Sequence, residues 1–312
     1  MGAGGPADEY VPRRAARLSE LDGREGRIAL THWGPQDASP ILLLHGWMDC
    51  GAGFQLLVDH LPDDWPLVAV DWPGYGRSAR RADRYWFADH VAELDWLVHV
   101  LSPDRPVRLI GHSMGGTVAS IYAGVRPARV AWIANLEGFG MPELPHAQFP
   151  GQLESWLDAL KSPPAARVYP QLEALALALQ RANPRLPATH ARYLARAWTR
   201  AVDRGFEILA DPRQQLPTPI RYARADLEAC WARVRAPLLL LYGAESDYMQ
   251  RAIGADALSR LRSLMPTMVA RCIAGAGHLL PHEQPAQVAR ALREFAAAAG
   301  AAPRGEPGRD LR

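Results

Sequence analysis

The clearest fold signal in the chain is the stretch Val107-Arg108-Leu109-Ile110-Gly111-His112-Ser113-Met114-Gly115-Gly116. A short apolar run stops at a glycine, a serine follows shortly after, and a helical pattern begins at Thr117. This order predicts a strand, a sharp turn and a helix, with the pattern G-x-S-x-G at the turn. Gly111 and Gly115 leave room for a turn so tight that side chains there would clash. The sequence therefore predicts that Ser113 projects from the end of a strand, at the N-terminus of a helix.

Apolar runs of strand length recur on both sides of this turn. The runs that predict strands are residues 27–31, 40–44, 67–70, 107–110, 130–134, 238–242 and 267–273. Longer amphipathic stretches connect several of them; apolar residues recur at helical spacing at Phe87, Val91, Leu94, Val98 and Leu101. This alternation is typical of an α/β fold, in which helices cover a mostly parallel sheet.

The alternation is interrupted from about Phe139 to about Trp231. This region has no strand-like run, and its prolines separate helical pieces rich in Ala, Leu and Arg. Because proline ends helices, the region is predicted to be a set of short helices. We therefore expect a core formed by residues 1–138 and 232–298, a helical insertion over 139–231, and a disordered tail over 299–312.

Composition excludes several classes of protein. With 35 basic and 33 acidic side chains the net charge is only +2, which argues against a nucleic-acid binder. We find no apolar run long enough to span a membrane and no signal peptide. The three cysteines are widely spaced without a CxxC pattern, which argues against a disulfide framework or a cysteine zinc site. We expect a cytoplasmic protein with no metal and no cofactor; the oligomeric state stays open.

A serine hydroxyl is a poor nucleophile unless a base accepts its proton. Of the 10 histidines, His278 is the best candidate, because it follows the last predicted strand in Gly275-Ala276-Gly277-His278. A glycine-rich loop at that position lets the imidazole reach back over the carboxyl edge of the sheet. The sequence therefore predicts Ser113 as nucleophile and His278 as general base.

A carboxylate is expected to orient the base and to stabilise its protonated form. Asp247 follows the strand that precedes the His278 strand, and the chain order Ser, Asp, His is the expected one for this arrangement. Glu137 is a serious alternative, because it follows the strand next after that of Ser113 and also lies at the carboxyl edge. We favour Asp247 as the acid, with Glu137 as a substitute or a supporting group.

Acyl chemistry through a serine also needs donors for a negatively charged oxygen. One expected donor is the backbone N–H of Met114, which follows the nucleophile. The other is the backbone N–H of Trp47 in the stretch His45-Gly46-Trp47, where Gly46 allows close approach of the backbone. His45 is expected to have a structural role in this loop.

Together these motifs resemble the α/β-hydrolase superfamily. The marks that agree, in order, are His45-Gly46-Trp47, the loop from Asp71 to Ser78, the Ser113 turn, and Gly277-His278 with Glu283 and Pro285 downstream. The resemblance covers roughly residues 20–298 and is strongest to the esterase and serine-hydrolase-like group. It implies a helical cap inserted after the sixth strand. Ser113 stands where epoxide hydrolases and haloalkane dehalogenases have an aspartate, which excludes their usual alkyl-enzyme route.

The expected function is hydrolysis of a carboxylic ester, or a related acyl bond, through an acyl-enzyme. The aromatic residues of the insertion favour a small apolar acyl or ester substrate; they are Phe139, Phe149, Trp156, Tyr169, Tyr193, Trp198 and Tyr222. Acyl transfer, thioester hydrolysis and C–C bond hydrolysis are alternatives on the same residues. A ligand receptor with slow or no turnover is an alternative of a different class.

Overall fold

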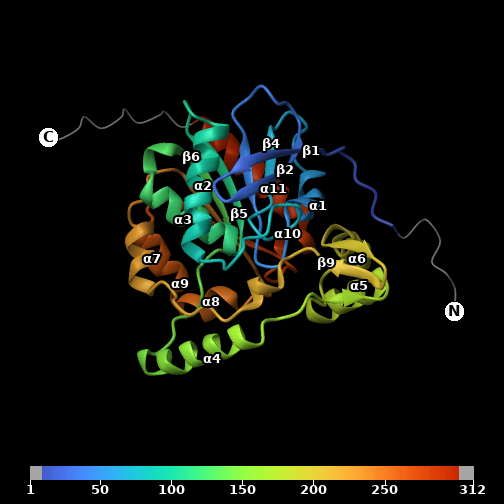
Figure 1. Cartoon of the computed structure of the whole chain (residues 1–312). Helices are drawn as coiled ribbons and strands as arrows, with labels where there is room; N and C mark the ends of the chain where they lie inside the picture. Colours follow the sequence, from blue (N-terminus) through green and yellow to red (C-terminus); the bar gives the residue numbers. More distant parts are fainter. Residues whose placement is uncertain (1–8, 302–312) are drawn as a thin grey trace.

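A single large sheet organises the protein, whose computed structural model describes residues 9–301 (Figure 1). Its eight strands lie in the order β1-β2-β4-β3-β5-β6-β10-β11. They are β1 (Arg17–Gly23), β2 (Gly26–Trp33), β3 (Ile41–Leu44), β4 (Leu67–Val70), β5 (Val107–His112), β6 (Val130–Leu136), β10 (Leu238–Gly243) and β11 (Met268–Ile273). From β4 to β11 neighbouring strands are parallel, while β1 and β2 pair antiparallel at one edge. This confirms the predicted fold class.

Helices cover both faces of the sheet, as the alternation of buried side chains in β3 shows. Leu42 and Leu44 belong to a core shared with α2 (Phe87–Leu101) and α3 (Met114–Val125). Ile41 and Leu43 belong to a second core shared with α1 (Gln55–Val58) and α11 (Pro285–Ala301). Because successive side chains of a strand point to opposite faces, a wholly apolar strand must be covered on both sides.

The insertion after β6 contains strands as well as helices. Its elements are α4 (Phe149–Lys161), β7 (Val168–Tyr169), α5 (Leu172–Ala182), α6 (Ala188–Ala197), β8 (Thr199–Val202), β9 (Gly205–Ile208) and α7 (Arg224–Trp231). The expectation that this region has no strand is wrong, because β7, β9 and β8 form a small antiparallel sheet. These strands are short and lack a buried face, so they give no apolar run; Gly205, at φ +127°, follows the turn between β8 and β9.

The parts of the insertion differ in how they meet the core. α4 lies at the edge of the molecule, whereas α5, α6 and β9 form a separate group (Figure 1). α6 is tied to the core where Tyr193 Oη donates to the carbonyl of Ala52, at 3.0 Å. α7 packs on α3 so closely that a Cβ at Gly124 would lie 2.0 Å from the carbonyl oxygen of Cys230. The division into a core and an insertion over 139–231 stays our proposal.

Two further expectations concern the ends of the chain and membranes. The predicted tail begins inside α11, which continues to Ala301, and residues 302–312 lie outside the described part. Among residues 9–301, every helix is too short or too polar to cross a bilayer.

Candidate active site

The turn between β5 and α3 has the geometry that the glycine pattern predicted. Ser113 adopts φ 51° and ψ −115°, an unfavourable conformation for a residue with a side chain. A Cβ at Gly111 would lie 2.5 Å from the backbone of Gly115, and a Cβ at Gly115 would lie 2.0 Å from the carbonyl oxygen of Leu44. Gly111 is therefore required for β5 to approach the start of α3, and Gly115 for α3 to approach the end of β3.

Backbone strain concentrates around this turn. Within residues 9–301, the non-glycine residues at positive φ are Met48 at 61°, Ser113 at 51° and Glu137 at 55°. They lie in the loops after β3, β5 and β6, at the carboxyl edge of three neighbouring strands. Strain of this kind costs on the order of 1–3 kcal/mol per residue and persists where the surrounding structure enforces it. Its clustering at one edge marks this edge as a candidate site.

His278 bridges Ser113 and Glu137. Its Nε2 lies 2.9 Å from Ser113 Oγ, and its Nδ1–H donates to Glu137 Oε2 at 2.7 Å. The His278 side chain is 31% exposed, while Glu137 is fully buried. With Nδ1 carrying the proton, Nε2 is free to accept the Ser113 proton. Ser113 and His278 therefore lie in hydrogen-bond contact, and their roles as nucleophile and base stay a prediction.

The Glu137 carboxylate is held by groups from the strand β10 and the loop after it. Gly243 N–H donates to Oε1 at 2.7 Å, and Ser246 Oγ donates to Oε2 at 2.8 Å. These hydrogen bonds satisfy the buried carboxylate and offset the cost of removing it from water. Glu137 is therefore fixed as an acceptor that faces the imidazole of His278.

The expectation that Asp247 orients His278 is wrong as a description of this structure. Asp247 precedes α8 (Tyr248–Ile253); its side chain is 71% exposed and pairs with Arg251 at 3.0 Å. The loop after β10 instead turns Ser246 inward, and Ser246 supports Glu137. Asp247 thus points to solvent while its neighbour faces the site.

The two N–H groups expected to face an oxyanion lie beside Ser113. Met114 is the first residue of α3, and a Cβ at Gly46, next to Trp47, would lie 3.2 Å from Ser113 Cβ. Within residues 9–301, neither the Trp47 nor the Met114 backbone N–H donates to another protein group. Both are therefore available to a ligand, and their role as an oxyanion hole stays a prediction.

His45 keeps the Trp47 loop in place. Its Nδ1–H donates to the carbonyl of Gly46 at 2.7 Å, and its Nε2 accepts the N–H of Trp72 at 3.1 Å. The ring is fully buried, and burial lowers the pKa of His45, so it stays neutral. These bonds agree with the structural role expected for His45.

Two residues contact His278 in ways that the sequence analysis did not predict. The Tyr248 ring lies against the imidazole, with ring centroids 4.3 Å apart, and its hydroxyl donates to the carbonyl of Gly140 at 2.9 Å. His112 supports the backbone of the same residue, because its Nε2–H donates to the His278 carbonyl at 2.8 Å. Burial lowers the pKa of His112 to about 3, so this ring is neutral and keeps the proton on Nε2.

A second group of polar side chains is buried behind the candidate site. Potential ligand atoms of Asp49, His112 and His282 lie within 4.8 Å of one another, a spacing that a metal ion could use. However, both Asp49 oxygens already accept hydrogen bonds, from Cys50 N–H, Trp198 Nε1–H and His282 Nε2–H. Hydrogen bonds alone therefore satisfy this carboxylate.

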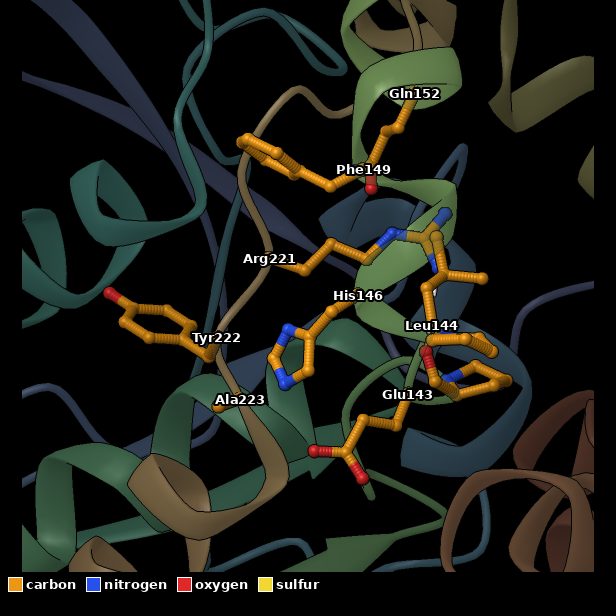
Figure 2. Close-up of a pocket in the computed structure, with 10 residues that line it drawn as sticks. Glu143, Leu144, His146, Phe149, Gln152, Arg221, Tyr222 and Ala223 are labelled. Atoms are coloured by element: carbon orange, nitrogen blue, oxygen red, sulfur yellow. Dashed lines mark hydrogen bonds between the residues drawn. The ribbon is translucent and has the colours of Figure 1, made fainter.

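A cavity of about 520 Å³ opens between the start of α4 and the segment before α7 (Figure 2). Its walls combine apolar side chains such as Phe149, Leu144 and Tyr222 with the polar groups of Arg221 and His146. Ser113, His278 and Glu137 are not among its lining residues, so it is a separate hollow within the insertion.

Comparison with known proteins identifies the family. The model of the α/β-hydrolase fold family matches residues 39–285. The chain belongs to the α/β-hydrolase family. It is therefore a hydrolase by family, as the resemblance in its motifs predicted.

Individual relatives narrow the comparison. The serine hydrolase-like protein of Danio rerio is 33% identical over 237 residues, which cover 73% of this chain and 72% of that protein. The 2-(acetamidomethylene)succinate hydrolase of Mesorhizobium japonicum is 26% identical over 298 residues, 95% of this chain and 98% of that protein. Among solved structures, the thioesterase domain from the curacin biosynthetic pathway has a TM-score of 0.76 and 26% identity, covering 88% of this chain and 98% of that domain.

Proposed function

We propose that this protein cleaves a carboxylic ester, or a closely related acyl bond, through an acyl-enzyme on Ser113. One observation carries the proposal: His278 contacts Ser113 Oγ through Nε2 and Glu137 through Nδ1, at 2.9 Å and 2.7 Å. A nucleophile, a base and a carboxylate that orients the base are the groups that acyl transfer through serine requires. Glu137 takes the role that the sequence prediction gave to Asp247.

The reaction begins when His278 Nε2 accepts the Ser113 proton as Oγ attacks the carbonyl carbon of the substrate. The carbonyl oxygen becomes an oxyanion that accepts hydrogen bonds from the Trp47 and Met114 N–H groups. The imidazolium then gives its proton to the oxygen of the leaving alcohol, which departs as the acyl-enzyme forms. Water repeats the sequence, with His278 as base, and releases the acid.

Glu137 stabilises the positive charge that His278 acquires in each step. It does so as a hydrogen-bond acceptor that Gly243 N–H and Ser246 Oγ hold in place. The packing of Tyr248 against the imidazole limits the ring to the orientation that serves both partners.

The family and the insertion support a proposal for the substrate class. We propose a small substrate with an apolar acyl group; the cavity with Phe149, Leu144 and Tyr222 supports a binding role for the insertion. Relatives named as a thioesterase and as a 2-(acetamidomethylene)succinate hydrolase support neighbouring acyl bonds on the same groups. Thioester hydrolysis, acyl transfer and C–C bond hydrolysis remain variants of this proposal.

The location and partners also remain predictions. We expect a cytoplasmic protein, and its free cysteines Cys50, Cys230 and Cys272 support a reducing compartment. We expect no nucleic-acid partner, which the small net charge of +2 supports.

A panel of nitrophenyl esters of increasing acyl length, with a matched thioester series, tests the function. We expect steady turnover and a single fluorophosphonate adduct on the peptide that contains Ser113. A burst of nitrophenol without further turnover would instead favour the slow-turnover receptor. Turnover that persists after complete labelling of Ser113 would contradict the proposal.

A further inference from the structure

A second carboxylate–histidine pair lies buried beside the candidate active site. His282 Nε2–H donates to Asp49 Oδ2 at 3.0 Å, and the side chains are 2% and 7% exposed. Neither residue contacts Ser113 or takes part in the chemistry proposed above. Burying such a pair is costly unless its remaining hydrogen bonds are also made, so the partners of each member indicate what it does.

Asp49 fixes the end of the loop that carries Trp47. Its Oδ1 accepts the Cys50 N–H at 2.7 Å, and its own N–H donates to the carbonyl of Gly46 at 3.3 Å. Met48, between Trp47 and Asp49, is held at φ 61°. A strained residue needs a firm anchor next to it, and the buried Asp49 side chain supplies that anchor.

His282 fixes the segment that carries His278. It lies in α10 (Leu280–Glu283), and its N–H donates to the carbonyl of Leu279 at 2.8 Å. The same short helix also contacts the residue before His278, because Glu283 accepts the N–H of Gly277. The side chain of His282 therefore links Asp49 to a segment, residues 277–283, that its own hydrogen bonds hold together.

The insertion joins this pair through α6 and the residue that follows it. Trp198 Nε1–H donates to Asp49 Oδ1 at 2.7 Å, and the Trp198 ring lies against His282 with centroids 6.3 Å apart. His190, within α6, contacts the carbonyl of His282 through Nδ1 at 2.8 Å. The Trp47 loop, the His278 segment and the insertion thus meet at Asp49.

We propose that the Asp49–His282 pair, with Trp198, sets the position of the Trp47 N–H relative to His278. Through these contacts, the position of the insertion on the core affects the geometry of the oxyanion site. These are positioning residues, since none of them touches the reacting atoms. The proposal rests on the function proposed above for its kinetic consequence, but its structural part does not.

The kinetic test compares His282→Gln and Asp49→Asn with His32→Gln. His32 is the matched control, because it is also buried and contacts Ser19 Oγ through Nε2, away from both loops. We expect kcat per fluorophosphonate-titrated site to fall about 10- to 100-fold in the two pair variants, with little change in KM. Affinity for a trifluoromethyl ketone, whose adduct carries an oxyanion, should fall by the same factor, while His32→Gln stays near wild type.

Trp198→Phe, which keeps the ring and removes the N–H, should cause a smaller loss in the same direction. Added to His282→Gln it should cause less loss than it does in the wild-type background, because both act on Asp49. Unchanged kcat per active site in the pair variants, or unchanged affinity for the ketone, would overturn the proposal. Turnover lost on chelation and restored by Zn²⁺ would also overturn it, by making Asp49, His112 and His282 a metal site.

Hydrogen exchange provides a readout that does not depend on any activity. Trp198→Phe should speed amide exchange in residues 45–50 and in residues 277–283 together, and His32→Gln should not. If exchange in these two segments is unaffected, the proposal fails even if the wild-type protein turns over esters. If exchange responds but the wild-type protein cleaves no ester, the positioning stands and the proposed function fails.

Discussion

Two carboxylate–histidine pairs of similar length lie close together in this protein and have different surroundings. In the Glu137–His278 pair the distance is 2.7 Å, and the second ring nitrogen faces Ser113 Oγ. In the Asp49–His282 pair the distance is 3.0 Å, and within residues 9–301 the second ring nitrogen has no partner. The His278 side chain is 31% exposed and that of His282 only 2%.

The difference shows that the pair alone does not define a reaction centre. A histidine can serve as a base only if a proton donor stands at its free nitrogen and a substrate can reach it. His278 meets both conditions at the strained turn of Ser113, whereas His282 is enclosed by Trp198 and His112. The Glu137–His278 pair is suited to proton transfer, and the Asp49–His282 pair is suited to holding the surrounding loops in position.

The largest expected effect is that of removing the Ser113 hydroxyl, the partner that the Glu137–His278 pair has and the Asp49–His282 pair lacks. Ser113→Ala should reduce turnover by on the order of a million-fold, as loss of a serine nucleophile does in a protease. Ser120→Ala is the matched control, since Ser120 is buried in the same helix, where it donates to the carbonyl of Gly116 and accepts from Asn135 Nδ2, both at 2.8 Å, without contacting His278. Rates of ester hydrolysis by the folded proteins measure both effects; near-normal activity of Ser113→Ala would show that Ser113 is not the nucleophile.

Acid stability probes the buried pair. Burial raises the pKa of Asp49, but the charge and hydrogen bond of His282 outweigh it and lower this pKa from 3.8 to about 2. Because the folded-state pKa is the lower one, this stabilisation is present above about pH 4 and is lost as the pH falls toward 2. A shift of this size corresponds to about 2 kcal/mol of unfolding free energy.

Urea unfolding at pH 5 and at pH 2.5 measures this contribution. Wild-type protein should lose about 2 kcal/mol more than Asp49→Asn between the two conditions, because the variant has no carboxylate to protonate. An Asp49→Asn protein with the full wild-type acid dependence would show that the pair does not hold its charge in the folded state.

The smallest effect concerns the hollow in the insertion, away from both pairs. Phe149→Ala removes an apolar wall of the cavity. If only long acyl chains extend from Ser113 as far as this hollow, KM for long-chain esters should rise by about tenfold, with little change for acetates. Leu177→Ala, an exposed apolar residue of α5, is the control. Equal KM changes across all acyl lengths would show that the cavity does not bind the acyl chain.

The sequence predicted those features of the site that are encoded locally. Ser113 and His278 each lie in a glycine-rich turn directly after an apolar strand, so their place at the carboxyl edge follows from the pattern. The choice between Glu137 and Asp247 depends on which side chain turns inward, and the sequence places both at that edge. Gly138, which follows Glu137, is required by the close approach of this loop to α3, because a Cβ there would lie 2.4 Å from the backbone of Gly116.

The buried pair and the small sheet of the insertion were not predicted, for different reasons. Asp49 and His282 are far apart in the chain, and their contact depends on how the Trp47 loop and α10 meet. β7, β8 and β9 are stabilised by pairing with one another rather than by an apolar face, so periodicity gives no signal for them.

The central claim is that Glu137 supports His278, and kcat for Glu137→Gln against Asp247→Asn tests it most directly. Each variant replaces a carboxylate with the amide of the same shape. We expect Glu137→Gln to lose about ten-thousand-fold in kcat, as the equivalent change does in a protease triad. Asp247→Asn, at a side chain that is 71% exposed, should lose less than about tenfold, the equivalent of roughly 1.4 kcal/mol. The reverse ranking would contradict the account, because it would make the exposed Asp247 the acid of the reaction.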